Sequence, residues 1–66
     1  MTLTDRLNAA EAALEAHRSE TGDEFSSNEE TMIDLLTNLR HLCDAEDLDF
    51  QSIARMSLSN FNNERE

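Results

Sequence analysis

The interval between apolar residues is the feature that most constrains the fold of this chain. Apolar residues recur at intervals of three and four, and the chain contains no proline and one glycine, Gly22. Intervals of three and four follow one face of an α-helix, whereas a strand needs an interval of two. Residues that break helices are also nearly absent. We therefore predict an all-α fold: a small helical hairpin preceded by an N-terminal helix.

Three helices are predicted, over residues 4–18, 28–45 and 49–62, with a loop over residues 19–27. The first carries a narrow seam with spacings of four, three, four and three, formed by Leu3, Leu7, Ala10, Leu14 and His17. The second carries a broader stripe suited to a core, formed by Met32, Leu35, Leu36, Leu39, Leu42 and Cys43. The third carries Phe50, Ile53, Ala54, Ser57, Leu58 and Phe61 at helical spacing.

The linkers predict how these helices meet. The short link between the second and third helices indicates an αα-hairpin, and the first helix is expected to be a mobile or partner-dependent arm. Its seam could pack against the second helix or against a second copy of the chain. We favour packing within the chain, because short helices draw their stability from tertiary contacts.

Capping residues support the predicted helix starts. Ser27 with Glu30 three residues later forms a capping-box pattern before the second helix, and Thr2 with Asp5 is a weaker match before the first. In the loop, we expect Phe25 to pack inward as a hydrophobic staple against the second helix.

A longer pattern covers about half of the chain. Residues 34–45 read DLLTNLRHLCDA and are followed by Leu48-Asp49-Phe50, by Ala54-Arg55-Met56-Ser57 and by Phe61. This pattern resembles a group of small acidic helical proteins carried by phages, plasmids and integrated elements. The group has no assigned chemistry, so the resemblance implies no catalytic or binding residue.

In that group, a glycine commonly stands at the position of Asp47. Aspartate adopts the left-handed conformation at a greater cost than glycine. We therefore do not expect the second helix to end in a simple glycine-type cap. Asp47 or Asp49 is expected to cap the third helix.

The short chain limits how much core it can form. A single domain of 66 residues buries about 60% of its unfolded surface, which leaves a monomer marginally stable. Such chains usually need a disulfide, a metal or a partner subunit. Cys43 is the only cysteine, so no internal disulfide can form, and oligomerisation or docking on a larger partner remains. We expect a cytoplasmic protein in the host cell, because the chain has neither a signal-peptide pattern nor an apolar stretch of roughly 20 residues.

Charge limits the classes of partner. Fifteen Asp and Glu oppose five Arg, which gives a formal net charge of −10. Such a chain repels nucleic acid and attracts basic protein surfaces. The predicted partner-binding residues are the carboxylates crowded into the first half: Glu11, Glu15, Glu20, Asp23, Glu24, Glu29, Glu30 and Asp34.

No metal site is expected. The acidic cluster that starts at Asp44 does not match an EF-hand loop, because Leu48 stands at a ligand position and Arg55 replaces the final glutamate. His41 and Cys43 are two residues apart and point in different directions on a helix, so they cannot share one ion.

No enzymatic activity or cofactor is expected either. Cys43 is best interpreted as a small core hydrophobe. No nucleophile with a base, and no pair of acids in a pocket, can be assembled from the sequence.

Two functions fit these observations. The leading hypothesis is a non-enzymatic inhibitor from a mobile element. This anti-CRISPR-like acidic protein would bind a basic nucleic-acid-binding surface of a host defence complex, such as a CRISPR effector, and block its binding of DNA or RNA. The alternative is a homodimeric helical adaptor or regulatory protein. It would assemble through the first helix or through the apolar stripe of the second helix. Its charge would serve only solubility or reflect a salt-rich habitat.

Overall fold

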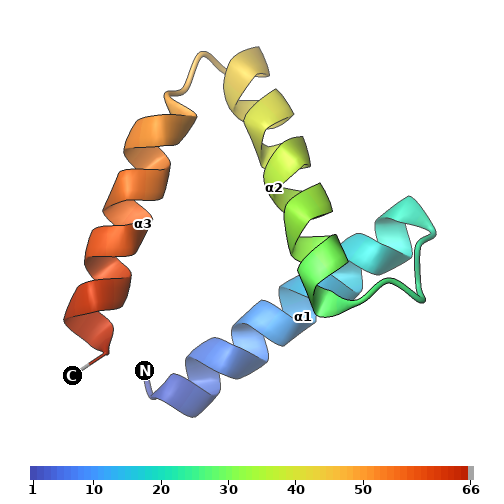
Figure 1. Cartoon of the computed structure of the whole chain (residues 1–66), viewed down its shortest axis with the longest axis horizontal. Helices are drawn as coiled ribbons and strands as arrows, with labels where there is room; N and C mark the ends of the chain where they lie inside the picture. The colour runs from blue at the N-terminus through green and yellow to red at the C-terminus, as the bar shows by residue number, and fades with distance from the viewer. Residues whose placement is uncertain (66) are drawn as a thin grey trace.

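Three helices make up the computed structural model, which describes residues 1–65. They are α1 (Leu3–Thr21), α2 (Asn28–Ala45) and α3 (Phe50–Glu64) (Figure 1). The all-α prediction is confirmed, because α2 and α3 form a two-helix hairpin and α1 precedes it. No helix among the described residues is long and apolar enough to cross a bilayer.

The end of α1 differs from its prediction by three residues. The helix continues through Thr21 and ends at Gly22, which has a φ of 76°. Gly22 adopts this left-handed conformation without the clash that a Cβ would cause, and nothing before it in residues 19–21 breaks a helix. The N–H of Asp23 then donates to the carbonyl of Arg18 at 3.0 Å. The predicted loop over residues 19–27 is therefore shorter, and α2 occupies the range that the spacing predicts.

Both predicted capping boxes form. The N–H of Asp5 donates to Thr2 Oγ1, and the N–H of Thr2 donates to the Asp5 carboxylate, each at 3.1 Å. Ser27 and Glu30 make the same reciprocal pair at the start of α2, at 3.1 and 3.3 Å. These bonds satisfy N–H groups that have no partner within the helix.

The turn between α2 and α3 overturns the expectation for the end of α2. Asp47 adopts a φ of 58°, in the left-handed region. The N–H of Leu48 donates to the carbonyl of Cys43 at 2.8 Å, and the N–H of Asp47 donates to that of Asp44 at 3.4 Å. These two bonds form a Schellman motif, so α2 has a glycine-type end although an aspartate occupies the glycine position. Asp49 caps α3.

The tightest packing lies between α1 and α2. Leu14 of α1 is 5% exposed and Thr31 of α2 is 2% exposed. Arg18 reaches across from α1, where its Nη1 donates to Asn28 Oδ1 at 3.1 Å and to Thr31 Oγ1 at 3.3 Å. The prediction of a mobile arm is therefore wrong, because the C-terminal half of α1 packs within the chain. Its N-terminal half is exposed at Leu3 and Leu7.

The core is smaller than predicted. Cys43 is buried, as predicted, but its stripe neighbours Met32, Leu36, Leu39 and Leu42 remain exposed. The predicted core of α2 is wrong because α3 diverges from α2 beyond the turn, so their facing stripes do not meet (Figure 1). The staple prediction is also wrong, because Phe25 is fully exposed.

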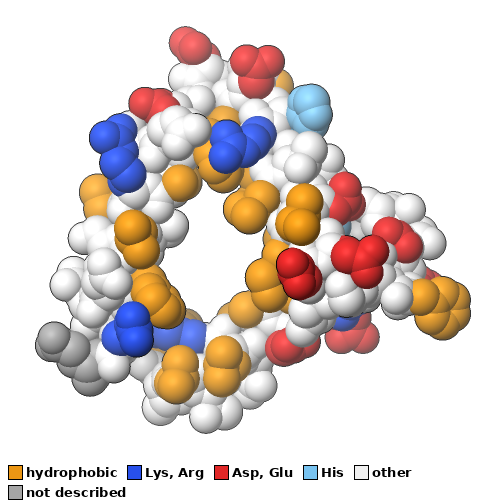
Figure 2. All heavy atoms as spheres, in the orientation of Figure 1, with side chains coloured by type: hydrophobic (Ala, Val, Ile, Leu, Met, Phe, Trp, Pro, Cys, Tyr) orange, Lys and Arg blue, Asp and Glu red, His pale blue; other side chains and the backbone are white. Residues whose placement is uncertain are grey.

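The resulting molecule is flat and open. Its extents are 36 × 32 × 16 Å and its radius of gyration is 13.2 Å, compared with about 11 Å for a compact domain of this length. Figure 2 shows an opening between the three helices, with hydrophobic side chains around it. The predicted inward stripes are therefore exposed to solvent.

Candidate functional site

The predicted partner-binding carboxylates gather where α1 meets α2. Acidic side chains crowd the right-hand side of Figure 2, over this junction. Contacts between the helices hold the region together: Asn28 Nδ2 donates to Glu11 Oε1 at 3.1 Å, and His17 Nε2 lies 3.0 Å from Asp34 Oδ2. We call this set of eight residues the acidic corner: Glu11, Glu15, Glu20, Asp23, Glu24, Glu29, Glu30 and Asp34.

Three of the eight carboxylates are engaged within the chain. Glu11 accepts the bond from Asn28, and Glu30 closes the capping box of α2. Asp34 faces the largely buried ring of His17. The contacts of Glu11 and Asp34 join α1 to α2, and that of Glu30 caps α2, so the three carboxylates have a structural role.

The other five carboxylates are free. Their side chains make no hydrogen bond or ion pair with another residue in the range 1–65. The five residues are Glu15, Glu20, Asp23, Glu24 and Glu29. Glu15 and Glu24 approach each other from α1 and the loop, where they line a shallow depression of about 360 Å³ together with Arg18 and Ser19. Arg18 is the only arginine in this part of the sequence, and its guanidinium keeps its positive charge while it donates to the neutral side chains of Asn28 and Thr31. One positive charge stands against five free carboxylates, so the corner keeps an excess of negative charge.

The remaining arginines lie away from the acidic corner. Arg40 stacks over the ring of Phe50 at 4.2 Å, and Arg65 lies 5.2 Å from the ring centre of Phe61. Arg6 pairs with Glu64 at 3.1 Å. The acidic corner thus lies at one end of α1 and charged groups of both signs lie at the other, while a separate acidic cluster with Asp44, Glu46 and Asp47 lies at the α2–α3 turn.

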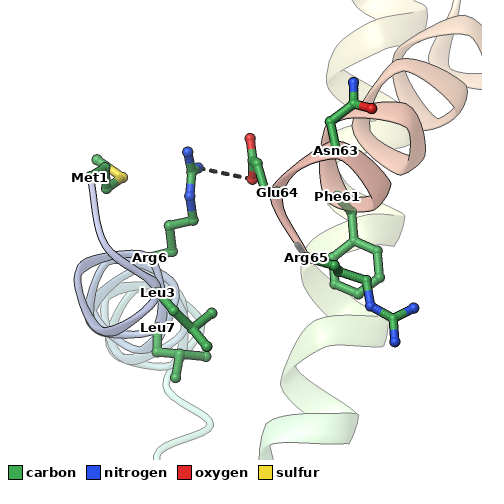
Figure 3. A pocket seen from close by; sticks show the side chains of 8 residues that line it. All are labelled: Met1, Leu3, Arg6, Leu7, Phe61, Asn63, Glu64 and Arg65. Atoms are coloured by element: carbon green, nitrogen blue, oxygen red, sulfur yellow. Dashed lines mark ion pairs between the residues drawn. The ribbon is translucent and has the colours of Figure 1, made fainter.

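A second surface feature lies between the start of α1 and the end of α3. A groove of about 760 Å³ is lined by Leu3 and Leu7 on one side and Phe61 on the other. Figure 3 shows the Arg6–Glu64 ion pair bridging its two walls. We call this feature the α1–α3 groove. Sequence reasoning missed it because its walls come from opposite ends of the chain, although the leucine seam and the α3 stripe each marked one wall.

The Asp49 carboxyl at the start of α3 has an altered pKa. Hydrogen bonds from Ser52 and Gln51 hold the pKa of the Asp49 carboxyl below its ordinary value, which accords with its capping role. Cys43 is a buried free thiol. No group of three or more His, Cys, Asp or Glu residues in the described range could hold a metal ion. The surfaces that the fold does present are the free carboxylates of the acidic corner and the α1–α3 groove, whose apolar walls carry charged residues at the rim.

Comparison with known proteins adds no further information. No protein-family model matches this chain, and no curated protein or solved structure was found to match it.

Proposed function

We propose that this protein is a non-enzymatic inhibitor that binds a basic nucleic-acid-binding surface of another protein. By analogy with small acidic anti-CRISPR proteins carried by mobile elements, the target would belong to a host defence complex, such as a CRISPR effector. The acidic corner would occupy the surface that otherwise binds DNA or RNA. The observation that carries this proposal is the set of five free carboxylates at the α1–α2 junction.

Charge density supports the proposal. Duplex DNA carries one charge per roughly 1.7 Å of its axis, which a single row of glutamates one turn apart cannot match. Packing α1 against α2 places a second acidic segment, with Glu24 and Glu29, beside the row that contains Glu15. Two adjacent acidic segments come closer to the charge density of a nucleic acid, and the single positive charge of Arg18 offsets only one of the five free carboxylates.

A charge-matched pair of variants tests the proposal. The corner variant replaces three free carboxylates (E20Q, E24Q and E29Q), and the control variant replaces three acids near the α2–α3 turn (D44N, E46Q and D47N). Glu30 is left unchanged because its carboxylate caps α2. Both variants lose the same charge, so they differ only in where it is removed.

The measurement is capture of nucleic-acid-binding proteins from a lysate of bacteria with an active CRISPR system, followed by competition of the captured complex with labelled DNA. We expect the corner variant to lose about tenfold in affinity at 50 mM salt, because three exposed charge pairs at about 0.5 kcal/mol each correspond to that factor. The control variant should bind like the unaltered chain, and both should release the partner at 500 mM salt. Equal losses in the two variants would contradict a specific role for the corner.

The alternative function remains the homodimeric adaptor or regulatory protein, in which charge serves only solubility. It predicts that neither variant changes partner capture. The same experiment therefore separates the two functions.

A further inference from the structure

We propose that a second copy of this chain covers the exposed apolar stripes and that the α1–α3 groove lies within the dimer interface. The proposal concerns assembly and holds for either function above. Its main support is the amount of apolar surface that the single chain leaves in water.

The exposed area is too large for a stable monomer of this mass. A compact folded monomer of 7.5 kDa exposes about 4,250 Å², whereas this chain exposes 5585 Å². The excess of about 1,300 Å² per copy corresponds to about 2,600 Å² for two copies. That total lies within the roughly 2,000–5,000 Å² buried in permanent dimers.

Large apolar side chains on all three helices contribute to the exposed surface. Leu3 and Leu7 of α1, Leu36 and Leu39 of α2, and Phe61 of α3 are all large side chains on the predicted inward stripes, and all are exposed. Figure 2 shows hydrophobic side chains around the central opening. Soluble monomers rarely expose apolar surface on this scale.

The position of the charged groups distinguishes a second copy from a basic partner. A basic partner would be drawn to the acidic corner, which lies at the opposite end of α1 from the α1–α3 groove. The rim of the groove carries both signs, with Arg6, Arg65 and Glu64. In a two-fold symmetric interface, Arg65 of one copy can therefore face Glu64 of the other.

The expected response to salt distinguishes this proposal from the proposed function. Two chains of like net charge repel each other, and salt screens that repulsion beyond a Debye length of about 10 Å at 0.1 M. Dimerisation should therefore strengthen as salt rises, whereas binding to a basic partner should weaken.

Sedimentation equilibrium of the full chain tests the proposal, at 50 and 500 mM salt and over a range of chain concentrations. We expect a dimer whose dissociation constant falls at least threefold at the higher salt. L7E and F61E, both in the groove, should each raise the dissociation constant by at least tenfold. M56E is the matched control: Met56 lies on the other face of α3 and is 64% exposed, compared with 54% for Phe61. It should leave the dissociation constant unchanged.

A second measurement covers the case in which a groove variant fails to fold. The melting temperature of the unaltered chain should rise with chain concentration, because association stabilises the folded state by mass action. A monomer at every concentration and at 500 mM salt would overturn the proposal. A dimer that L7E, F61E and M56E affect equally would overturn the assignment of the interface. A monomer whose groove binds the apolar dye ANS would overturn the dimer proposal and would indicate that the groove binds a small apolar ligand.

Discussion

At the scale of single residues, two aspartates in the α2–α3 turn have opposite effects on stability. Asp47 occupies the left-handed region, which is unfavourable for a residue with a Cβ. Asp49 lies two residues later, where its Oδ1 accepts hydrogen bonds from the N–H groups of Gln51 at 3.0 Å and Ser52 at 3.3 Å. One residue therefore costs free energy in the turn, and the other stabilises the helix that follows.

Asp47→Gly should stabilise the protein. Glycine relieves the backbone cost of the left-handed conformation, about 1–2 kcal/mol for a typical residue, and part of the gain is lost to the greater entropy of glycine in the unfolded chain. We expect the free energy of unfolding to rise by about 0.5 to 1 kcal/mol in urea titrations at fixed chain concentration. Asp47→Ala removes the same charge but keeps the Cβ, so it should not stabilise. Equal gains in both variants would point to charge relief instead of backbone strain.

The Asp49 cap predicts a pH dependence of α3. The pKa of this carboxyl is lowered below 3.8 by its hydrogen bonds with Ser52 and then by the bond from Gln51. Because the pKa is lower in the folded state, the stabilisation is fully present above the unfolded pKa and is lost as the pH falls through the folded pKa. Helicity of α3, measured from amide chemical shifts between pH 5 and pH 2, should therefore decrease below about pH 4.

Asp49→Asn is the control for this prediction. Asparagine caps helices about as well as aspartate but does not titrate. Protonation of the other acids affects both proteins alike, so it cancels in the difference between them. If α3 loses helicity identically in both proteins, the pH effect arises elsewhere.

At the scale of secondary-structure elements, packing of α1 on α2 is the main tertiary contact. Leu14 and Thr31 are buried there, and Arg18 joins the two helices through hydrogen bonds. α3 contributes no buried residue and meets the rest of the molecule at the turn and through the exposed Arg6–Glu64 pair. Such an exposed ion pair contributes little stability.

Leu14→Ala should therefore destabilise the protein by about 2 kcal/mol, at the low end of the range for buried leucines because the packing is only two helices deep. Met56→Ala, at an exposed site on α3, should change the free energy of unfolding by less than about 0.5 kcal/mol. Chemical denaturation followed by circular dichroism measures both values. Similar effects of the two substitutions would mean that α1–α2 packing is not the main support of the fold. A glutamate at the buried position of Leu14 would also disrupt the packing of α1 on α2. Leu7 is exposed, so Leu7→Glu tests assembly without this effect on the fold.

At the scale of the whole molecule, the open arrangement separates a charged surface from an apolar one. The acidic corner lies at one end of α1, and the α1–α3 groove lies at the other. An acidic partner-binding surface and an apolar self-association surface can therefore coexist without competing for the same residues. Their opposite expected responses to salt follow directly from this separation.

Helix type, the two capping boxes and the apolar face of each helix could be read from the sequence, because intervals of three and four and the Ser27–Glu30 pair are local signals. The end of α1 and the cap that ends α2 were predicted wrongly. The acidic corner was also predictable as a set, because its members are close in the sequence. The engagement of Glu30 was predictable from its capping box, but that of Glu11 and Asp34 was not, since their contacts join α1 to α2 and depend on folding.

The sequence by itself determined that the chain forms three amphipathic helices with a strong excess of negative charge, because both properties depend only on neighbouring residues. Only the tertiary structure decided which stripes meet. α3 diverges from α2 beyond the turn (Figure 1), and one half of α1 packs on α2 around the buried Leu14. The apolar residues that a sequence pattern assigns to a core can therefore remain exposed, because burial depends on the angle between helices and not on the spacing within them.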